Sequence, residues 1–244
     1  MSVSLSALAV SLAGLKLQNP VLLSAGTAAY GREVSGVIDL DALGGLVTKA
    51  VSVAPRSGAP SPRVAEFGGG MINAVGLANP GVDTVQREEL PWLARHLTRA
   101  RVIVNVVGSQ VEDFATVVAR LDGDAGKDAF ELNVSCPNVK AGGLEFGADR
   151  TALEAVVRGA RAATARPLFV KLSPLLPDVG ETARIAMGAG ANGISLTNTL
   201  PGLVIDVKAR RPALGFGTGG VSGSALLPVA VLATWKVFKA TGAP

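Results

Sequence analysis

Short apolar segments of strand length alternate with helix-like segments along the chain, and this alternation constrains the fold more than any other feature. The strand-like segments are PVLLS (20–24), GLVTK (45–49), RVIVNVV (101–107), AFELN (129–133), PLFVKL (167–172) and GISLTN (193–198). The helix-like segments cover residues 85–97, 111–121, 151–163, 179–190 and 223–242. Nearly continuous apolar strands that alternate with helices are typical of βαβ units and of a parallel sheet. The sequence therefore predicts an α/β protein.

A single domain is expected to span residues 1–244. A chain of 244 residues that is 48% hydrophobic can bury one sizeable core, and α/β barrels commonly use this length as one domain. No linker, low-complexity segment or shift in composition divides the chain. At the N-terminus, Val3 and Leu5 alternate with serines, which predicts a strand there.

Two parallel-sheet architectures compete for this pattern. A Rossmann sheet carries G-x-G-x-x-G after its first strand, whereas AGTAAYG (25–31) follows PVLLS here, and no Gly-Lys-Ser/Thr of a P-loop occurs. A TIM (β/α)8 barrel instead places functional side chains at the carboxyl ends of its strands. Polar or reactive side chains end or follow all six predicted strands: Thr27, Lys49, Asn105, Asn133 with Cys136, Lys171, and Thr197 with Asn198. We therefore predict a TIM barrel, with an open parallel sheet as the alternative.

Two lysines lie at the ends of predicted buried strands, Lys49 in GLVTK and Lys171 in FVKL. A lysine in such a place is costly unless an anionic group pairs with it. The partner could be a structural Asp or Glu, a phosphate, a carboxylate or a reduced flavin ring, and a Schiff-base lysine would also fit. The pattern alone leaves these possibilities open.

Cys136 is the only cysteine of the chain and lies in ELNVSCPNVKAGG (131–143). Single cysteines are mostly small buried hydrophobic residues, but this one follows a strand end and is flanked by Pro137, Asn133 and Asn138. A nucleophilic cysteine is usually activated by a histidine, and the only histidine, His96, is expected on an outer helix surface. Proton abstraction by the thiolate is therefore the better hypothesis.

Composition excludes several classes of function. One cysteine cannot form an internal disulfide, an iron–sulfur cluster or a cysteine-based zinc site, and we expect no metal site. The net charge of +4 comes from dispersed basic residues with only 4% aromatic residues, which does not favour a nucleic-acid partner. No apolar run is long enough to span a membrane. We expect a cytoplasmic protein, since nothing points to an oxidising compartment.

Several motifs together resemble the class 1 dihydroorotate dehydrogenases. NVSCPNVKAGG (133–143) is similar to their catalytic segment, and its continuation NVKAGGLEFG resembles the class 1B catalytic subunit in particular. The resemblance continues, in family order, through NPVLLSAGT (19–27), TKAVSVAPRSGAPSPRVAE (48–66), MINAVGLANPG (71–81), FVKLSP (169–174), SLTNT (195–199) and GGVSGSAL (219–226). Any one motif would be weak evidence, but the set covers nearly the whole chain and is specific.

The resemblance implies FMN-dependent oxidation of dihydroorotate to orotate, in de novo pyrimidine biosynthesis. Cys136 would be the general base that removes a proton from C5, while hydride leaves C6 for the flavin. The substrate contacts implied by motif position are Lys49, Asn73, Ala74, Val75, Gly76, Leu77, Asn133, Asn198 and Thr199. The implied FMN contacts are Ala25, Lys49, Ala50, Asn105, Asn133, Lys171, Thr197 and Gly223.

The class 1B resemblance also implies partners. The catalytic subunit would form a homodimer and pass electrons to NAD through a second subunit that holds FAD and an iron–sulfur cluster; fumarate, as in class 1A, is the alternative acceptor. The chain supplies about six of the eight βα units of a barrel, so we expect two further units, with loops for the FMN phosphate, to lie outside this sequence. Another flavin-dependent dihydropyrimidine oxidoreductase and a non-catalytic fragment remain alternatives.

Overall fold

A six-stranded parallel sheet forms the centre of the computed structural model, which describes residues 5–135 and 145–244. Its strands occupy the sheet in chain order: β3 (Leu22–Leu23), β4 (Gly45–Val47), β7 (Arg101–Val106), β8 (Ala129–Asn133), β9 (Leu168–Lys171) and β10 (Gly193–Ser195). Each strand lies within one of the apolar segments that predicted it. The α/β fold is therefore confirmed, and the sheet is curved but open, with β3 and β10 at its edges.

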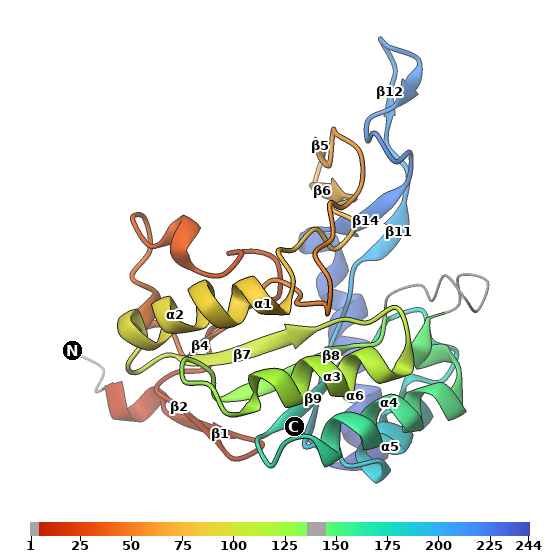
Figure 1. Ribbon diagram of the computed structural model, residues 1–244. Helices are drawn as coiled ribbons and strands as arrows, with labels where there is room; N and C mark the ends of the chain where they lie inside the picture. The colour runs from red at the N-terminus through yellow and green to blue at the C-terminus, as the bar shows by residue number, and fades with distance from the viewer. Residues whose placement is uncertain (1–4, 136–144) are drawn as a thin grey trace.

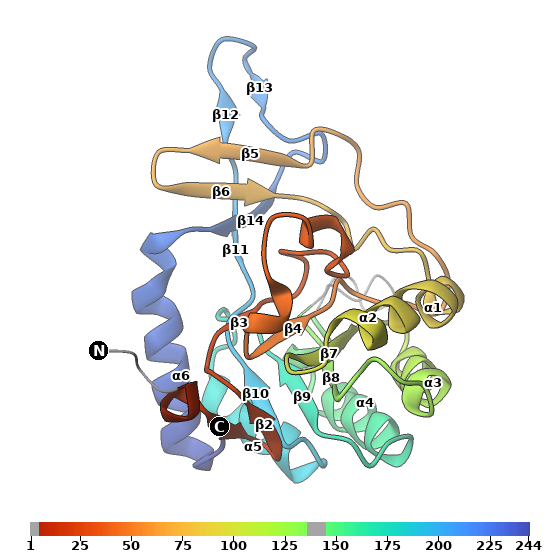
Figure 2. The same ribbon diagram turned by 90° about the vertical axis from the view of Figure 1, so that its left-hand side faces the viewer.

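Helices follow the strands and cover the outer face of the sheet (Figures 1 and 2). They are α1 (Val82–Thr84), continued by a π-helical turn (Val85–Glu89) into α2 (Leu90–His96), then α3 (Val111–Asp122), α4 (Arg150–Ala162), α5 (Val179–Gly188) and α6 (Leu227–Thr241). Asp149 caps α4 by accepting a hydrogen bond from the backbone N–H of Ala152 at 2.9 Å, and Asp178 caps α5 in the same way. These caps explain why both helices begin where they do. None of the described helices has the length and apolarity that a membrane span requires.

Alternation along each strand divides the core into two apolar clusters. Phe130 and Leu132 of β8 pack with the helices in the larger cluster. Ala129 of the same strand packs with Ile103 and Phe169 in a smaller cluster on the other face, beneath the hairpin of β1 (Val10–Leu12) and β2 (Leu15–Leu17). Successive side chains of a strand point to opposite faces. Asn105 and Glu131, two residues beyond Ile103 and Ala129, therefore lie on this inner face.

A second, antiparallel sheet was not predicted from the sequence. It contains β5 (Val64–Phe67), β6 (Gly70–Asn73), β11 (Leu200–Gly202) and β14 (Gly219–Ser222), in the order β11-β14-β6-β5, and the hairpin of β12 (Ile205–Asp206) and β13 (Arg211–Pro212) extends beyond it (Figure 2). Its strands are only three or four residues long, and β6, β11 and β14 contain glycine, so they lack a clear alternating pattern. The N-terminal strand predicted around Val3 and Leu5 lies partly outside the described residues, and the described part, Leu5–Leu8, forms a 3-10 helix and not a strand.

The side chain of Asp41 fixes the loop that leads into β7. The carboxylate of Asp41 accepts hydrogen bonds from the backbone N–H groups of Thr98, Arg99 and Ala100 at 2.8, 2.7 and 3.0 Å, and from the Thr98 hydroxyl at 2.9 Å. Burial alone would raise the pKa of this carboxyl, but the hydrogen bonds from Ala100, Arg99 and Thr98 outweigh burial and hold its pKa far below the usual range. Asp41 thereby joins the segment before β4 to the start of β7.

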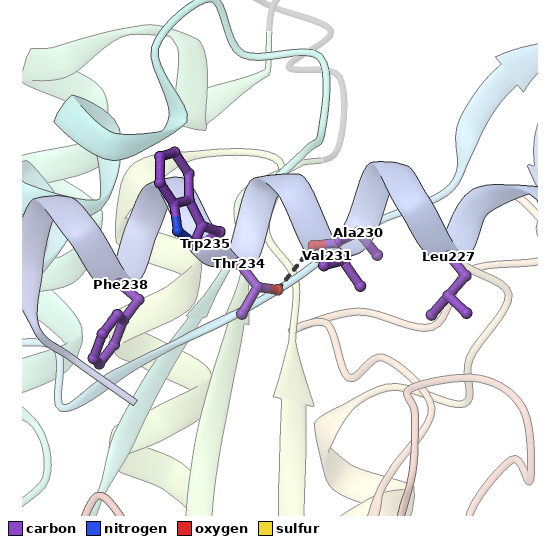
Figure 3. Close-up of a pocket in the computed structure, with 6 residues that line it drawn as sticks. All are labelled: Leu227, Ala230, Val231, Thr234, Trp235 and Phe238. Atoms are coloured by element: carbon purple, nitrogen blue, oxygen red, sulfur yellow. Dashed lines mark hydrogen bonds between the residues drawn. The ribbon is translucent and has the colours of Figure 1, made fainter.

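Helix α6 carries an exposed apolar stripe (Figure 3). Leu227, Val231, Trp235 and Phe238 are each more than half exposed. With Ala230 and Thr234 they line an open pocket, in which the Thr234 hydroxyl donates to the Ala230 carbonyl at 2.9 Å. The pocket is almost wholly apolar and contains no predicted site residue, so it is not the place where the predicted chemistry gathers.

Candidate active site

The carboxyl edge of the parallel sheet gathers most of the predicted site residues. Asn133 ends β8 and lies opposite Lys171, which ends β9 and in turn lies opposite Ser195 of β10. Asn105 of β7 lies opposite Glu131 of β8. Lys49 follows β4, while Thr197 and Asn198 follow β10. The parallel register thus brings these groups to one rim. Cys136, the predicted base, lies outside the described residues.

Lys49 and Lys171 are partly buried, and within the described part of the chain neither forms an ion pair. The sequence left open a structural Asp or Glu partner for each, and no described carboxylate takes that place. A partly buried ammonium without a protein anion is costly. The rim is therefore suited to an anionic ligand.

Asn105 is fully buried, and only one of its two side-chain polar atoms has a hydrogen-bond partner among the described residues. Its Nδ2 donates to Oε1 of Glu131 at 2.6 Å, whereas its Oδ1 has no hydrogen-bond partner among the residues that the structure describes. Glu131 is 4% exposed. Buried polar atoms are rarely left unpaired. An acceptor of this kind can receive a hydrogen bond from an N–H group of a ligand.

The hydroxyl of Ser135 joins the two rim asparagines that were assigned to substrate. Asn198 Nδ2 donates to Ser135 Oγ at 2.7 Å, and Ser135 Oγ donates to Asn133 Oδ1 at 2.8 Å. Asn198 Oδ1 accepts from the backbone N–H of Thr199 at 2.9 Å. These bonds fix the orientation of both amides, so Asn133 presents its amide nitrogen as a donor. The sequence reasoning missed Ser135, although it lies inside the NVSCPN motif.

The predicted substrate loop leaves β6 at Asn73, whose Nδ2 donates to the carbonyl of Gly220 at 3.2 Å. Ala74 and Val75 form backbone bonds with Arg63 and Ala59, respectively. Gly76 and Leu77 both have positive φ, 69° and 57°. A Cβ on Gly76 would lie 2.4 Å from the backbone nitrogen of Ala59, so glycine is required there.

Asn79 anchors the end of this loop, and sequence reasoning missed it as well. Its Nδ2 donates to the Leu77 carbonyl at 2.8 Å, and its Oδ1 accepts from the Gly81 N–H at 2.9 Å and from the Ser52 hydroxyl at 3.1 Å. The side chain is 8% exposed. Asn79 therefore ties the substrate loop to the segment that follows β4.

The remaining predicted flavin contacts also lie around the rim. Ala25 follows β3 and packs against the smaller apolar cluster. The carbonyl of Ala50 accepts from the Tyr30 hydroxyl at 3.0 Å, and burial raises the pKa of Tyr30 and keeps it a donor. Leu200 of β11 pairs with Val221 of β14 in the second sheet. Because the two strands are antiparallel, Gly223, just past β14, lies towards the segment that precedes Leu200. Gly223 has φ of 145° and approaches the Gly69 carbonyl too closely for a Cβ.

The position of His96 and the arrangement of possible metal ligands both bear on the chemistry of this site. His96 is exposed on α2, where its ring stacks on Trp92 with centroids 4.2 Å apart, as expected for an outer helix. The described residues contain no group of three or more His, Cys, Asp or Glu side chains arranged to hold a metal ion. The described groups at the rim are amides, hydroxyls, lysines and the buried carboxylate of Glu131.

The dihydroorotate dehydrogenase family model matches residues 7–243, which include every described rim residue. The chain belongs to the dihydroorotate dehydrogenase family. It is 50% identical over 236 residues to a protein of Desulforudis audaxviator (strain MP104C) named dihydroorotate dehydrogenase B (NAD(+)), catalytic subunit, and the match covers 97% of this chain and 76% of that one. A Pelobacter propionicus protein of the same name is 47% identical, with 96% and 77% covered.

The fold of this chain also matches that of a solved structure. The crystal structure of the enzyme from Eimeria tenella in complex with ferulenol superposes with a TM-score of 0.79, covering 97% of this chain and 70% of that one, at 23% identity. At that identity the likeness shows the fold alone. The family is one of oxidoreductases, and the class 1B resemblance of the NVKAGG segment agrees with the names of the similar proteins.

Proposed function

We propose that this chain catalyses the FMN-dependent oxidation of dihydroorotate to orotate in pyrimidine biosynthesis. The observation that carries the proposal is a single rim with two lysines free of described carboxylates, a buried acceptor on Asn105 and two oriented amides, in a chain of this family. Dihydroorotate is an anion with ring N–H and C=O groups, so it requires cations, donors and acceptors together.

Each rim residue has a definite task under this proposal. Bound FMN would supply the acceptor for the hydride that leaves C6 of the substrate. Lys49 and Lys171 would hold negative charge on the ligands, and Asn105 would accept a ring N–H. Asn133 would donate from Nδ2, because Ser135 occupies its Oδ1.

Cys136 would take the C5 proton as general base, so a proton goes to sulfur while a hydride leaves the ring. A base whose pKa lies near the working pH is the most effective, and a thiol ionises near pH 8.5 or lower in an electropositive site. Asn73, Asn198 and Thr199, with residues 74–77, would hold the substrate above the rim. Ala25, Ala50, Thr197 and Gly223 would line the flavin.

The simplest test is a visible absorption spectrum of the purified chain after incubation with FMN, followed by anaerobic dihydroorotate. The proposal expects a bound flavin whose visible band bleaches with dihydroorotate and not with dihydrouracil. Bleaching by dihydrouracil instead would favour another dihydropyrimidine oxidoreductase, and the absence of any bound flavin would favour a non-catalytic fragment.

Lys171→Ala is expected to weaken FMN binding by about tenfold, because losing one partly screened ion pair with an anionic ligand costs on the order of 1.4 kcal/mol. Fluorescence titration of FMN measures the change. Lys208→Ala is the matched control, since Lys208 is exposed beyond β12, away from the rim. Equal FMN affinity in the Lys171 variant and the control would show that Lys171 does not contact the cofactor.

We further propose that electrons leave through a partner subunit with FAD and an iron–sulfur cluster, and that the catalytic subunit is a cytoplasmic homodimer. The electron-transfer partner is supported by the name of the similar proteins, which describes the catalytic subunit of a NAD(+) enzyme. The chain alone should reduce artificial dyes with dihydroorotate but not NAD. Adding the electron-transfer subunit should start NAD reduction; NAD reduction without it, or efficient turnover with fumarate, would contradict this.

A further inference from the structure

Asn105 and Glu131 form a buried, hydrogen-bonded polar pair inside the sheet, and this hydrogen bond determines which way the Asn105 amide faces. The two residues lie opposite each other on the adjacent strands β7 and β8. Both side chains are buried, at 0% and 4% exposure, and Asn105 Nδ2 lies 2.6 Å from Glu131 Oε1. The remaining amide atom, Asn105 Oδ1, has no partner among the described residues.

The carboxylate of Glu131 determines which way the side-chain amide of Asn105 faces. A carboxylate only accepts hydrogen bonds, so Glu131 draws the nitrogen of Asn105 towards itself and turns its oxygen away. Leaving a buried acceptor unpaired is unfavourable, because the atom has lost its hydrogen bonds to water and has gained none in return. A hydrogen-bond donor on a ligand would remove that penalty. The atom is not accessible to solvent in this structure, so a ligand reaches it only if the groups that cover it move.

We propose that Glu131 is a positioning residue, which holds Asn105 so that its Oδ1 accepts the N3–H of the isoalloxazine ring of FMN. The inference rests on the proposed function and adds a residue to which no role was assigned. The oxidised isoalloxazine ring has one N–H group, at N3. An acceptor atom that faces the ring can therefore accept a ring N–H hydrogen bond only from that group. Glu131 acts through Asn105 and does not itself touch the flavin.

The Glu131→Gln variant tests this proposal. The new side chain has nearly the same shape, but it no longer forces the Asn105 amide to face one way. The amide at 131 can donate to Asn105 Oδ1, which lets the Asn105 side chain turn over and present Nδ2 to N3–H. We expect the FMN dissociation constant to rise by about tenfold, the effect of one hydrogen bond exchanged for a donor–donor contact.

The second ligand in the test is 3-methyl-FMN, which lacks the N3–H. Wild-type chain should bind it about 30-fold more weakly than FMN, and in the Glu131→Gln variant this penalty should fall to about threefold, because the hydrogen bond is already lost. A merely structural role for Glu131 would weaken both flavins equally. Fluorescence titration gives all four constants without any measurement of activity.

A double variant that exchanges the amide and the carboxylate between positions 105 and 131 provides the matched rescue of FMN binding. In Asn105→Asp with Glu131→Gln, the amide at 131 donates to one oxygen of the carboxylate at 105, and the other oxygen remains an acceptor for N3–H. FMN affinity should return to within about threefold of wild type. Equal penalties for 3-methyl-FMN in wild type and Glu131→Gln would overturn the inference while leaving FMN binding intact. No binding of FMN to the wild-type chain would overturn the proposed function as well.

Discussion

Replacing Cys136 with alanine is expected to lower the rate of flavin reduction by dihydroorotate by about 10³-fold, the contribution typical of a positioned general base. The C5 proton then has no acceptor, so the hydride cannot leave C6 at the normal rate. Stopped-flow absorbance of the visible flavin band under single-turnover conditions measures the rate. FMN affinity should not change, because the flavin contacts proposed above lie on other residues.

Cys136→Ser provides the matched variant for this prediction. A hydroxyl is a far weaker acid than a thiol, which ionises near pH 8.5, so the serine enzyme should be nearly inactive at neutral pH and recover as pH rises. Wild-type rates should level off at lower pH than the rates of the serine variant. An alanine variant with normal single-turnover rates would show that another group takes the proton.

Asp41→Ala is expected to lower the free energy of unfolding by about 2 kcal/mol. The substitution leaves the N–H groups of Thr98, Arg99 and Ala100 without their shared acceptor. Bonds to a charged acceptor contribute more than neutral ones, but water can replace part of them at this partly exposed site. Urea unfolding monitored by circular dichroism measures the change. Asp39→Ala, two residues away, is the control, because Asp39 caps only its own turn.

The same carboxylate predicts a pH dependence of stability. Its pKa in the folded chain lies far below the usual value near 4, so its stabilisation is fully present above that unfolded value and is lost as pH falls towards the folded one. Asp41→Asn should therefore differ from wild type by a smaller amount at pH 3 than at pH 7. A constant difference between pH 7 and pH 3 would contradict the assignment.

The elements of the parallel sheet could be predicted because each is apolar on both faces. RVIVNVV and AFELN are mostly apolar, and β7 and β8 occupy them to within one residue. Helix boundaries were close for α3 and α4, where amphipathic periodicity is strong. The rim could be predicted too, because parallel strands deliver their carboxyl ends to one edge.

The second sheet and the supporting polar residues could not be predicted. The short strands β11 and β14 carry glycines that serve close packing, such as Gly220 against the side chain of Thr199, and this contact depends on residues far apart in the chain. Ser135 and Asn79 act by orienting other side chains, which only three-dimensional geometry shows. The pairing of Asn105 with Glu131 likewise follows from strand register and not from spacing.

The central claim is that this rim binds FMN and lets dihydroorotate reduce it. The most direct measurement is anaerobic titration of the chain reconstituted with FMN by dihydroorotate, followed through the visible flavin band, with orotate quantified at the end. The account predicts loss of the band with one orotate formed per flavin. A flavin that binds but stays oxidised in excess dihydroorotate would contradict it.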